Sequence, residues 1–155
     1  MDPLIISFFG ILGNILTCLE YLSPVPTFCR IMKNKSTEDF DCLPYICVVL
    51  NSSLWTYYGL IRPDYYVSTV NAFGVLMETI YIIIFLVYAT PSKRVSTALI
   101  ATSLDVGLAG GAILISHTQF SGALRAKVVG SMCLTPLLAM YASPLAILGT
   151  VIRTR

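Results

Sequence analysis

Residues 67–89 read VSTVNAFGVLMETIYIIIFLVYA, an apolar run that contains one charged side chain, Glu78. About 20 mostly apolar residues make a helix long enough to cross a lipid bilayer, so this run predicts a transmembrane helix. Lipid offers no partner for free backbone groups, and strands of about 10 residues with alternating polarity are absent. The fold class that we predict is therefore all-α transmembrane.

Four further stretches of the same kind lie outward from this run, at residues 4–22, 43–61, 95–116 and 128–152. We therefore expect five membrane spans. The segments between them are short and rich in turn-forming or charged residues. They predict a tight turn at Arg62-Pro63-Asp64, a break at Pro91-Ser92-Lys93-Arg94 and a helix cap for the second span within Ser36-Thr37-Glu38-Asp39.

The composition excludes several classes of protein. Hydrophobic residues make up 56% of the 155 residues, and charged residues only 12%, about half the share in a soluble domain. A net charge of +2 indicates no nucleic-acid partner. The five cysteines form no CxxC pair, and no nucleophile, base or metal-ligand set is present, so we expect no metal, no cofactor and no enzyme.

Basic residues predict the orientation in the membrane. With the N-terminus outside or lumenal, the inner segments hold seven basic residues, and the outer ones hold only Arg62, Arg125 and Lys127. Basic residues concentrate on the cytosolic side of membrane proteins, so we expect an outer or lumenal N-terminus and a cytosolic C-terminus. The seven inner residues are Arg30, Lys33, Lys35, Lys93, Arg94, Arg153 and Arg155.

An internal repeat is visible at a shift of 120 positions. Tyr21-Leu22-Ser23-Pro24-Val25 then aligns with Tyr141-Ala142-Ser143-Pro144-Leu145. One span separates the copies, so they run in the same direction, as in a parallel repeat. We expect a three-helix bundle at residues 4–89, a linker helix at 95–116 and the start of a second copy at 124–155. The alternative is that two membrane helices share these residues by chance.

By the arithmetic of the repeat, a complete second copy would end near residue 209, and we expect the chain to stop inside it. On this view a single chain does not transport, and it associates with itself or with a complete relative.

Prolines and polar residues inside the spans could carry function. Pro24, Pro44 and Pro144 lie near the basic ends of their spans, where each can kink its helix and form part of a gate. The alternative is that prolines are simply tolerated in membrane helices. Glu20, Glu78 and Asp105 are acidic residues within spans, and such side chains are functional candidates because they are costly in lipid.

Asn51 and Trp55 are four residues apart and share one helical face, and Asn71 lies near the start of the next span. An indole ring and amide groups suit a sugar, whose C–H faces stack on aromatic rings while its hydroxyls need hydrogen-bond partners. The alternative is that the asparagines join helices and the aromatic residues anchor the chain at the membrane surface.

Several motifs together resemble the SWEET family of sugar transporters. They are Pro24-Val25-Pro26-Thr27-Phe28, Lys33-Asn34-Lys35-Ser36-Thr37-Glu38, Leu43-Pro44-Tyr45, Leu54-Trp55-Thr56-Tyr57-Tyr58-Gly59, Ser68-Thr69-Val70-Asn71 and Met140-Tyr141-Ala142-Ser143-Pro144-Leu145. The resemblance covers the entire chain. It implies bidirectional facilitated diffusion of mono- or disaccharides, of the glucose, fructose or sucrose class, by alternating access. The Ser-Leu-Trp-Thr-Tyr-Tyr-Gly run is most similar to the subgroup of the vacuolar membrane and of hexoses, with the plasma membrane as the other location.

The resemblance also implies roles for single residues. Pro24, Pro44 and Pro144 match inner-gate prolines, and Tyr58 and Gly59 match residues near the outer gate. The substrate-binding positions are Trp55, Asn71, Asn51, Thr17, Glu20, Leu137 and Met140. Glu20 departs from the family, in which this position is usually uncharged. The partners implied are a sugar, the lipid bilayer and other SWEET-like chains in a homo- or hetero-oligomer. The alternative is a non-transporting subunit that regulates a full-length transporter.

Overall fold

A computed structural model describes residues 3–135 of the chain. Within this part no strand occurs, which confirms the all-α class. The helices are α1 Pro3–Leu22, α2 Val25–Asn34, α3 Leu43–Ile61, α4 Tyr65–Tyr88, α5 Pro91–Ala101, the π-helix η1 Thr102–Gly110 and α6 Gly111–Gln119. A further helix covers residues 122–135.

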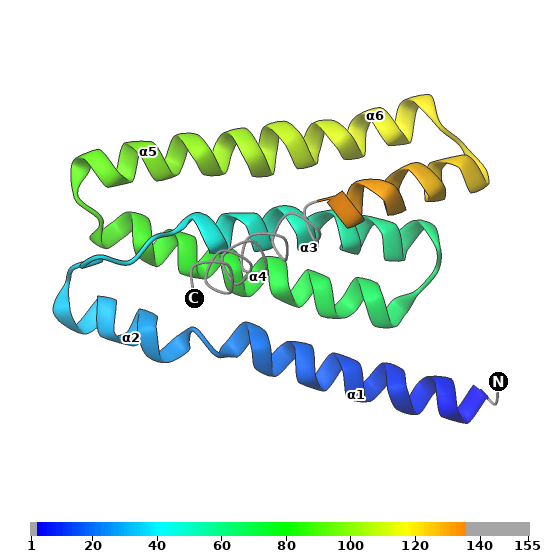
Figure 1. Cartoon of the computed structure of the whole chain (residues 1–155), viewed down its shortest axis with the longest axis horizontal. Coiled ribbons are helices and arrows are strands. Elements are labelled where there is room, and N and C mark those ends of the chain that lie inside the picture. The colour runs from blue at the N-terminus through cyan, green and yellow to red at the C-terminus, as the bar shows by residue number, and fades with distance from the viewer. Residues whose placement is uncertain (1–2, 136–155) are drawn as a thin grey trace, which may run out of the picture.

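The helices α3 and α4 form the middle of a bundle, with α1 and α2 on one side and α5, η1 and α6 on the other (Figure 1). α4 packs against α1, α2 and α3, while α3 also packs against η1. The helix over residues 122–135 lies beside α3, where its Val129 and Cys133 are buried against Leu54. The bundle therefore brings α1, α3 and α4 together, although α2 and two loops separate them in the sequence.

Three helical segments of the described part are long and apolar enough to cross a membrane, namely Leu4–Asn34, Tyr65–Tyr88 and Pro91–Gln119. They correspond to three of the five predicted spans. The predicted span at residues 43–61 is the helix α3, which is more polar because Asn51, Ser52 and Ser53 follow one another in its middle. Residues 128–152, the fifth predicted span, extend beyond the described residues.

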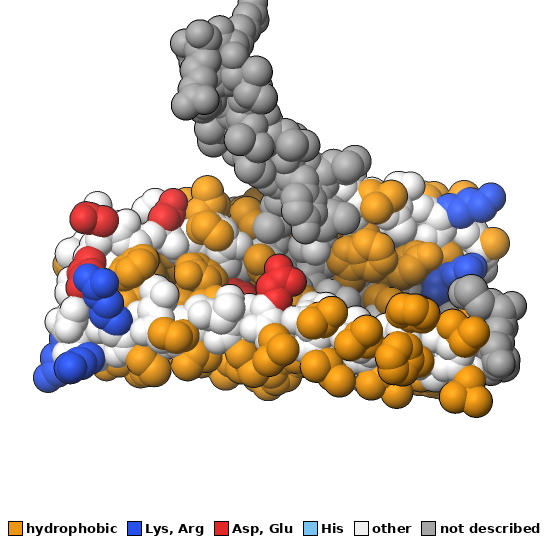
Figure 2. All heavy atoms as spheres, turned by 60° about the horizontal axis from the view of Figure 1, so that its bottom comes forward, with side chains coloured by type: hydrophobic (Ala, Val, Ile, Leu, Met, Phe, Trp, Pro, Cys, Tyr) orange, Lys and Arg blue, Asp and Glu red, His pale blue; other side chains and the backbone are white. Residues whose placement is uncertain are grey.

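The outer surface of α1 is strongly apolar, as expected for a helix in lipid. Figure 2 shows hydrophobic side chains over much of this face, with acidic and basic side chains together at the end where α2 lies, an acidic group near the middle and basic side chains at the opposite end. Leu4 is 78% exposed, and Phe9 is 64% exposed. Exposure of such large apolar side chains fits a bilayer better than water.

The prolines of the described residues lie at or near helix boundaries rather than in the middle of helices. Pro24 lies between α1 and α2 with φ −76° and ψ −10°, and it separates the two helices. Pro44 occupies the first turn of α3. The first N–H groups of a helix have no partner within it, so a proline there removes no hydrogen bond. The prediction that Pro44 kinks its span is therefore wrong, while its part in a gate stays a prediction.

The loop between α2 and α3 is organised around Glu38. Arg30 Nη2 donates to Glu38 Oε2 at 2.7 Å, and Asn34 Nδ2 donates to Oε1 at 2.8 Å. The hydrogen bond from Asn34 and the positive charge of Arg30 hold the pKa of Glu38 below its usual value. Lys93 Nζ donates to the Glu38 carbonyl oxygen at 2.7 Å. Glu38 thereby joins α2 to α5.

The predicted cap within Ser36-Thr37-Glu38-Asp39 is wrong, because α3 begins later in the chain. Its first residue is Leu43, whose N–H donates to Asp41 Oδ1 at 3.1 Å. Glu38 has a positive φ of 48° and is engaged by Arg30 and Asn34, so it is not the start of a helix.

A single guanidinium closes the end of α4. Arg94 Nε donates to the Leu86 carbonyl oxygen at 2.8 Å, and Nη2 donates to those of Val87 at 3.1 Å and Ala89 at 3.2 Å. The last carbonyl groups of a helix lack partners within it, so Arg94 fills this need. The predicted break at Pro91-Ser92-Lys93-Arg94 is confirmed, since α4 ends at Tyr88 and α5 begins at Pro91.

Candidate functional site

A cleft of about 550 Å³ lies between α1, α3 and the first half of α4. It contains four of the predicted substrate-binding residues, which come from three different helices. These are Thr17 from α1, Asn51 and Trp55 from α3, and Asn71 from α4. The remaining lining residues are Ile6, Phe9, Gly10, Gly13, Asn14, Asp64, Tyr66, Val67 and Val70.

The α3 side of the cleft combines an aromatic ring with an amide. Trp55 is half-buried and meets Tyr58 edge-on, with 5.6 Å between the ring centres. Asn51 lies one turn earlier on the same face, and its Oδ1 atom is covered yet accepts no hydrogen bond from the described residues. A buried acceptor without a partner costs free energy, and because this atom is covered, the Asn51 amide has to turn toward the cleft before a ligand can donate to it.

The α4 side contributes Asn71, which is held at both ends of its amide. Asn71 Nδ2 donates to the Val67 carbonyl oxygen at 2.8 Å, and Oδ1 accepts from the hydroxyl of Tyr21 at 3.4 Å. The amide keeps one free N–H and one free lone pair, since it has two of each. It therefore has both a donor and an acceptor left for a ligand.

Sequence reasoning missed Tyr21 as a residue of this region. Its hydroxyl contacts Ser52 Oγ at 3.1 Å as well as Asn71. The only sequence signal was its place in the repeated Tyr-x-Ser-Pro motif, which gave no indication that the ring turns toward α4.

The residues predicted for the outer gate lie at the far end of α3. Tyr58 lies beside Gly130, where an added Cβ would be 3.2 Å from the Tyr58 ring. Gly59 is buried against the start of α4, where a Cβ would be 2.7 Å from the Ser68 nitrogen. Neither residue lines the cleft, and their gating role stays a prediction.

The other predicted site residues lie elsewhere. Glu20 is exposed on α1 and is not among the residues that line the cleft. Pro24 and Pro44 lie at the end of the bundle that holds α2 and the loop around Glu38. Leu137, Met140 and Pro144 fall outside the described residues.

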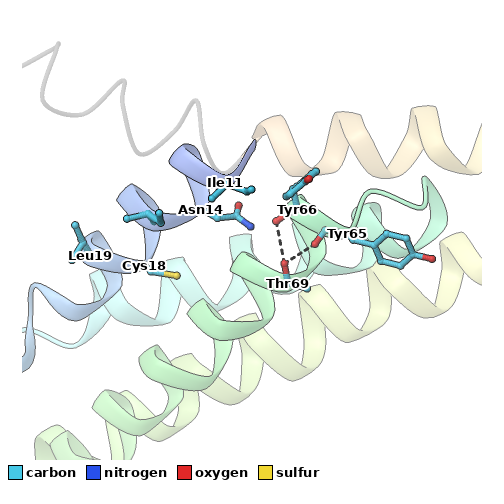
Figure 3. Close-up of a pocket in the computed structure, with 8 residues that line it drawn as sticks. Ile11, Asn14, Cys18, Leu19, Tyr65, Tyr66 and Thr69 are labelled. Carbon is cyan, nitrogen blue, oxygen red and sulfur yellow. Dashed lines mark hydrogen bonds between the residues drawn. The ribbon is translucent and has the colours of Figure 1, made fainter. Parts of the chain in front are cut away.

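A second groove of about 510 Å³ runs along the other side of α1 (Figure 3). Ile11, Asn14 and Cys18 line it from α1, and Tyr65, Tyr66 and Thr69 line it from the start of α4. The Thr69 hydroxyl donates to the Tyr65 carbonyl oxygen at 2.6 Å, so it is already occupied by its own helix. The groove offers fewer free polar groups than the cleft.

Buried Glu78 and half-buried Asp105, two acidic residues of the spans, lie away from the cleft. Glu78 is 3% exposed, and its Oε2 atom has no hydrogen-bond partner among the described residues. The same is true of Oδ1 of Asp105, which lies in η1. Within residues 3–135 no group of three His, Cys, Asp or Glu side chains could hold a metal ion.

Comparisons with known proteins agree with this geometry. Residues 7–93 match the family described as "Sugar efflux transporter for intercellular exchange". The chain is 44% identical over 153 residues to "Bidirectional sugar transporter SWEET16" and 42% identical over 150 residues to "Bidirectional sugar transporter SWEET17", both from Arabidopsis thaliana. These matches cover 97% and 96% of this chain but only 66% and 62% of the relatives, so the chain spans just under two thirds of their length.

A solved structure of a eukaryotic SWEET transporter superimposes with a TM-score of 0.83 at 38% sequence identity. The match covers 94% of this chain and 69% of the solved one. The arrangement of helices described above is therefore that of a known transporter.

Proposed function

The chain belongs to the SWEET family of sugar transporters, and from this premise we propose that it carries a sugar across a membrane in both directions by facilitated diffusion. Members of this family are transporters and not enzymes. The relatives with 44% and 42% identity are named bidirectional sugar transporters, which supports the proposal.

The single observation that carries the proposal is the cleft with Trp55, Asn51 and Asn71 on its walls. In the proposed complex the sugar lies with its C–H face on the indole ring of Trp55. One sugar hydroxyl donates to Oδ1 of Asn51 once that amide turns toward the cleft, and another bonds to the free N–H or lone pair of Asn71. A volume of about 550 Å³ is ample for a hexose.

The remaining predicted residues complete this proposal. Thr17 adds a hydroxyl to the cleft. Glu20, which does not line the cleft, and Leu137 and Met140, which fall outside the described residues, are proposed as further sugar contacts because the resemblance implies it. Pro24, Pro44 and Pro144 form the inner gate, and Tyr58 and Gly59 the outer one. In domain terms, residues 4–89 are the first bundle, 95–116 the linker helix and 124–155 the start of the second repeat.

The cleft is walled by α1, α3 and α4 in the described part of the chain. Alternating access requires a second wall, against which this bundle opens and closes. We propose that a SWEET-like bundle supplies it within a homo- or hetero-oligomer. The alternative function is that of a regulatory subunit, which would dock on a full-length transporter through the side of the cleft that α1, α3 and α4 do not line.

The test is the exchange of radiolabelled hexose in proteoliposomes, with and without a full-length relative. We expect exchange in both directions that does not depend on a pH gradient. Flux that requires the relative and depends on Trp55 of this chain supports transport by an oligomer. Unchanged flux of the relative after Trp55→Ala in this chain would favour the regulatory subunit, and no sugar binding or flux under any condition would contradict both.

Orientation and location are part of the proposal. We propose that the end of the bundle with Arg30 and Lys93 faces the cytosol. We also propose that the membrane is vacuolar, because the similarity to SWEET16 and SWEET17 supports the vacuolar subgroup that the sequence motifs indicated. The plasma membrane is the other location to test by microscopy of the tagged chain.

Accessibility of single cysteines tests the orientation. Ser36→Cys and Gln119→Cys introduce thiols at two exposed positions, in a background where Cys18, Cys29 and Cys47, the native thiols that are not buried, are replaced by serine. An impermeant thiol reagent applied from the outside of cells or the lumenal side of vesicles should label Gln119→Cys and spare Ser36→Cys. Labelling after detergent treatment is the control for reactivity, and the reverse pattern would invert the proposed topology.

A further inference from the structure

Tyr21 occupies the last turn of α1, three residues before Pro24. Its side chain is 9% exposed and lies on Gly74 of α4, where an added Cβ would be 2.4 Å from the Tyr21 Cζ atom. Only a glycine leaves room for a ring at this distance, so the absence of a side chain at position 74 determines where the tyrosine hydroxyl lies.

The hydroxyl of Tyr21 is the centre of a short hydrogen-bond chain. It has one proton, which goes to Asn71 Oδ1, so the hydroxyl of Ser52 is the donor in the 3.1 Å contact with Tyr21. Ser52 is completely buried, and water cannot replace this arrangement from its side. These hydrogen bonds therefore link Ser52 of α3 through Tyr21 of α1 to Asn71 of α4.

The hydrogen bond from Tyr21 fixes the orientation of the Asn71 amide. With its oxygen toward Tyr21 and its nitrogen toward the Val67 carbonyl group, Asn71 presents its free N–H and its free lone pair in fixed directions. Without the Tyr21 hydroxyl, the oxygen end loses its donor, and a rotated amide becomes available.

The main chain of Tyr21 is held as well. Tyr81 of α4 donates its hydroxyl proton to the Tyr21 carbonyl oxygen at 2.9 Å. The ring of Tyr81 also stacks on Phe28 of α2, with 4.5 Å between the ring centres. The position of Tyr21 is therefore fixed from both its side chain and its backbone, at the point where α1 ends.

From these contacts we propose that Tyr21 is a positioning residue for sugar binding, which acts by orienting the amide of Asn71. This inference rests on the proposed function, since it assigns to Asn71 a sugar ligand. Tyr21 does not line the cleft and does not touch the sugar. Its contribution is to keep Asn71 ready before the sugar arrives, which lowers the cost of ordering the site.

Tyr21→Phe tests the proposal, because it removes the hydroxyl and keeps the ring on Gly74. The chain has one tryptophan, Trp55, so a sugar titration followed by tryptophan fluorescence reports directly from the cleft. In the whole chain in lipid nanodiscs, we expect Tyr21→Phe to weaken sugar binding about three- to tenfold, the effect of one neutral hydrogen bond. The matched control is Tyr57→Phe, which removes a hydroxyl whose one hydrogen-bond partner within residues 3–135 is His117 Nδ1 at 3.4 Å, outside the cleft. Its sugar affinity should not change.

A double-mutant cycle separates positioning from a general structural role. In an Asn71→Ala background, Tyr21→Phe should weaken sugar binding no further, because the residue through which it acts is gone. Equal losses in both backgrounds would overturn the proposal, as would an unchanged affinity of Tyr21→Phe while the wild-type chain binds sugar.

A second cycle with the same variants measures the free energy of unfolding without sugar, so a coupling between Tyr21 and Asn71 is detected whatever the ligand. If coupling is present and the wild-type chain binds no sugar, the proposed function fails and the sugar-positioning role fails with it, while the contact stands. If the wild-type chain binds sugar and the cycle shows no coupling, only the positioning role is overturned.

Discussion

Trp55→Ala should weaken sugar binding about ten- to a hundredfold, the largest loss that we expect from any single side chain of the cleft. The indole is the only tryptophan of the chain, and it is the broad flat surface on the α3 wall. Its removal leaves the α3 wall of the cleft without an aromatic ring, because the other lining rings, Phe9 and Tyr66, come from α1 and α4. Equilibrium binding of radiolabelled hexose to the purified chain measures the loss without relying on tryptophan fluorescence.

Two variants serve as controls for this result. Trp55→Phe keeps an aromatic face and should lose less affinity than Trp55→Ala. Tyr65→Ala removes a ring that is 75% exposed and lies outside the cleft, so its affinity should equal that of the wild type. If Trp55→Ala binds sugar as tightly as the wild type, the indole is a packing residue, and the cleft is not the sugar site.

Gly59→Ala should destabilise the fold by about 1 to 3 kcal/mol, the usual effect of overpacking. A Cβ at this position would be 2.7 Å from the Ser68 nitrogen and 3.0 Å from the Asp64 carbonyl oxygen. Both are backbone atoms at the start of α4, and the Asp64 N–H already donates to the Gly59 carbonyl oxygen at 2.8 Å. The two helix ends therefore have to separate to admit a methyl group.

The denaturation midpoint in detergent, followed by the fluorescence of Trp55, measures this loss. Gly110→Ala is the matched control, because a Cβ added there meets no atom within 4 Å beyond its chain neighbours and its own helix backbone. That variant should be as stable as the wild type or slightly more so. Flux lost in Gly59→Ala with an unchanged midpoint would show that this glycine acts in a gate rather than in helix packing.

The long helices of the described residues were predicted from the sequence because hydropathy and turn residues act locally, whereas the short helix α2 was not among the predicted segments. The turn at Arg62-Pro63-Asp64 separates α3 from α4 as expected, and the break before Pro91 ends α4. The common face of Asn51 and Trp55 also follows from helical spacing alone, and both line the cleft. Residues of the site that share a helix were thus within reach of sequence reasoning.

Contacts between helices could not be predicted from the sequence. The approach of Tyr21 to Gly74 joins residues 53 positions apart, and nothing in either local pattern indicates it. The predicted start of the span at residue 43 agrees with α3, but its cap was misplaced for a related reason. Glu38 has the right spacing for a cap, but Arg30 and Asn34 of the preceding helix engage its carboxylate, and Asp41 accepts the first N–H instead.

The fourth span shows a third limit. Its glycines indicate a bent helix, but the wide turn of η1 from Thr102 to Gly110 depends on hydrogen bonds that skip one residue more than usual. Helix propensities of single residues do not distinguish a π-helix from an α-helix.

Arg94 has two separate roles, one as a positive charge during membrane insertion and one as a hydrogen-bond donor in the folded protein. While the chain is being inserted, the translocation machinery responds to the positive charge, and a lysine would give the same signal. Once the helices have packed, the planar guanidinium serves three carbonyl groups at the end of α4, a task for which the single ammonium group of lysine has the wrong shape. We therefore expect fewer natural substitutions of Arg94 by lysine than membrane orientation alone would permit. A count of basic residues records its charge but not its three hydrogen bonds to the end of α4.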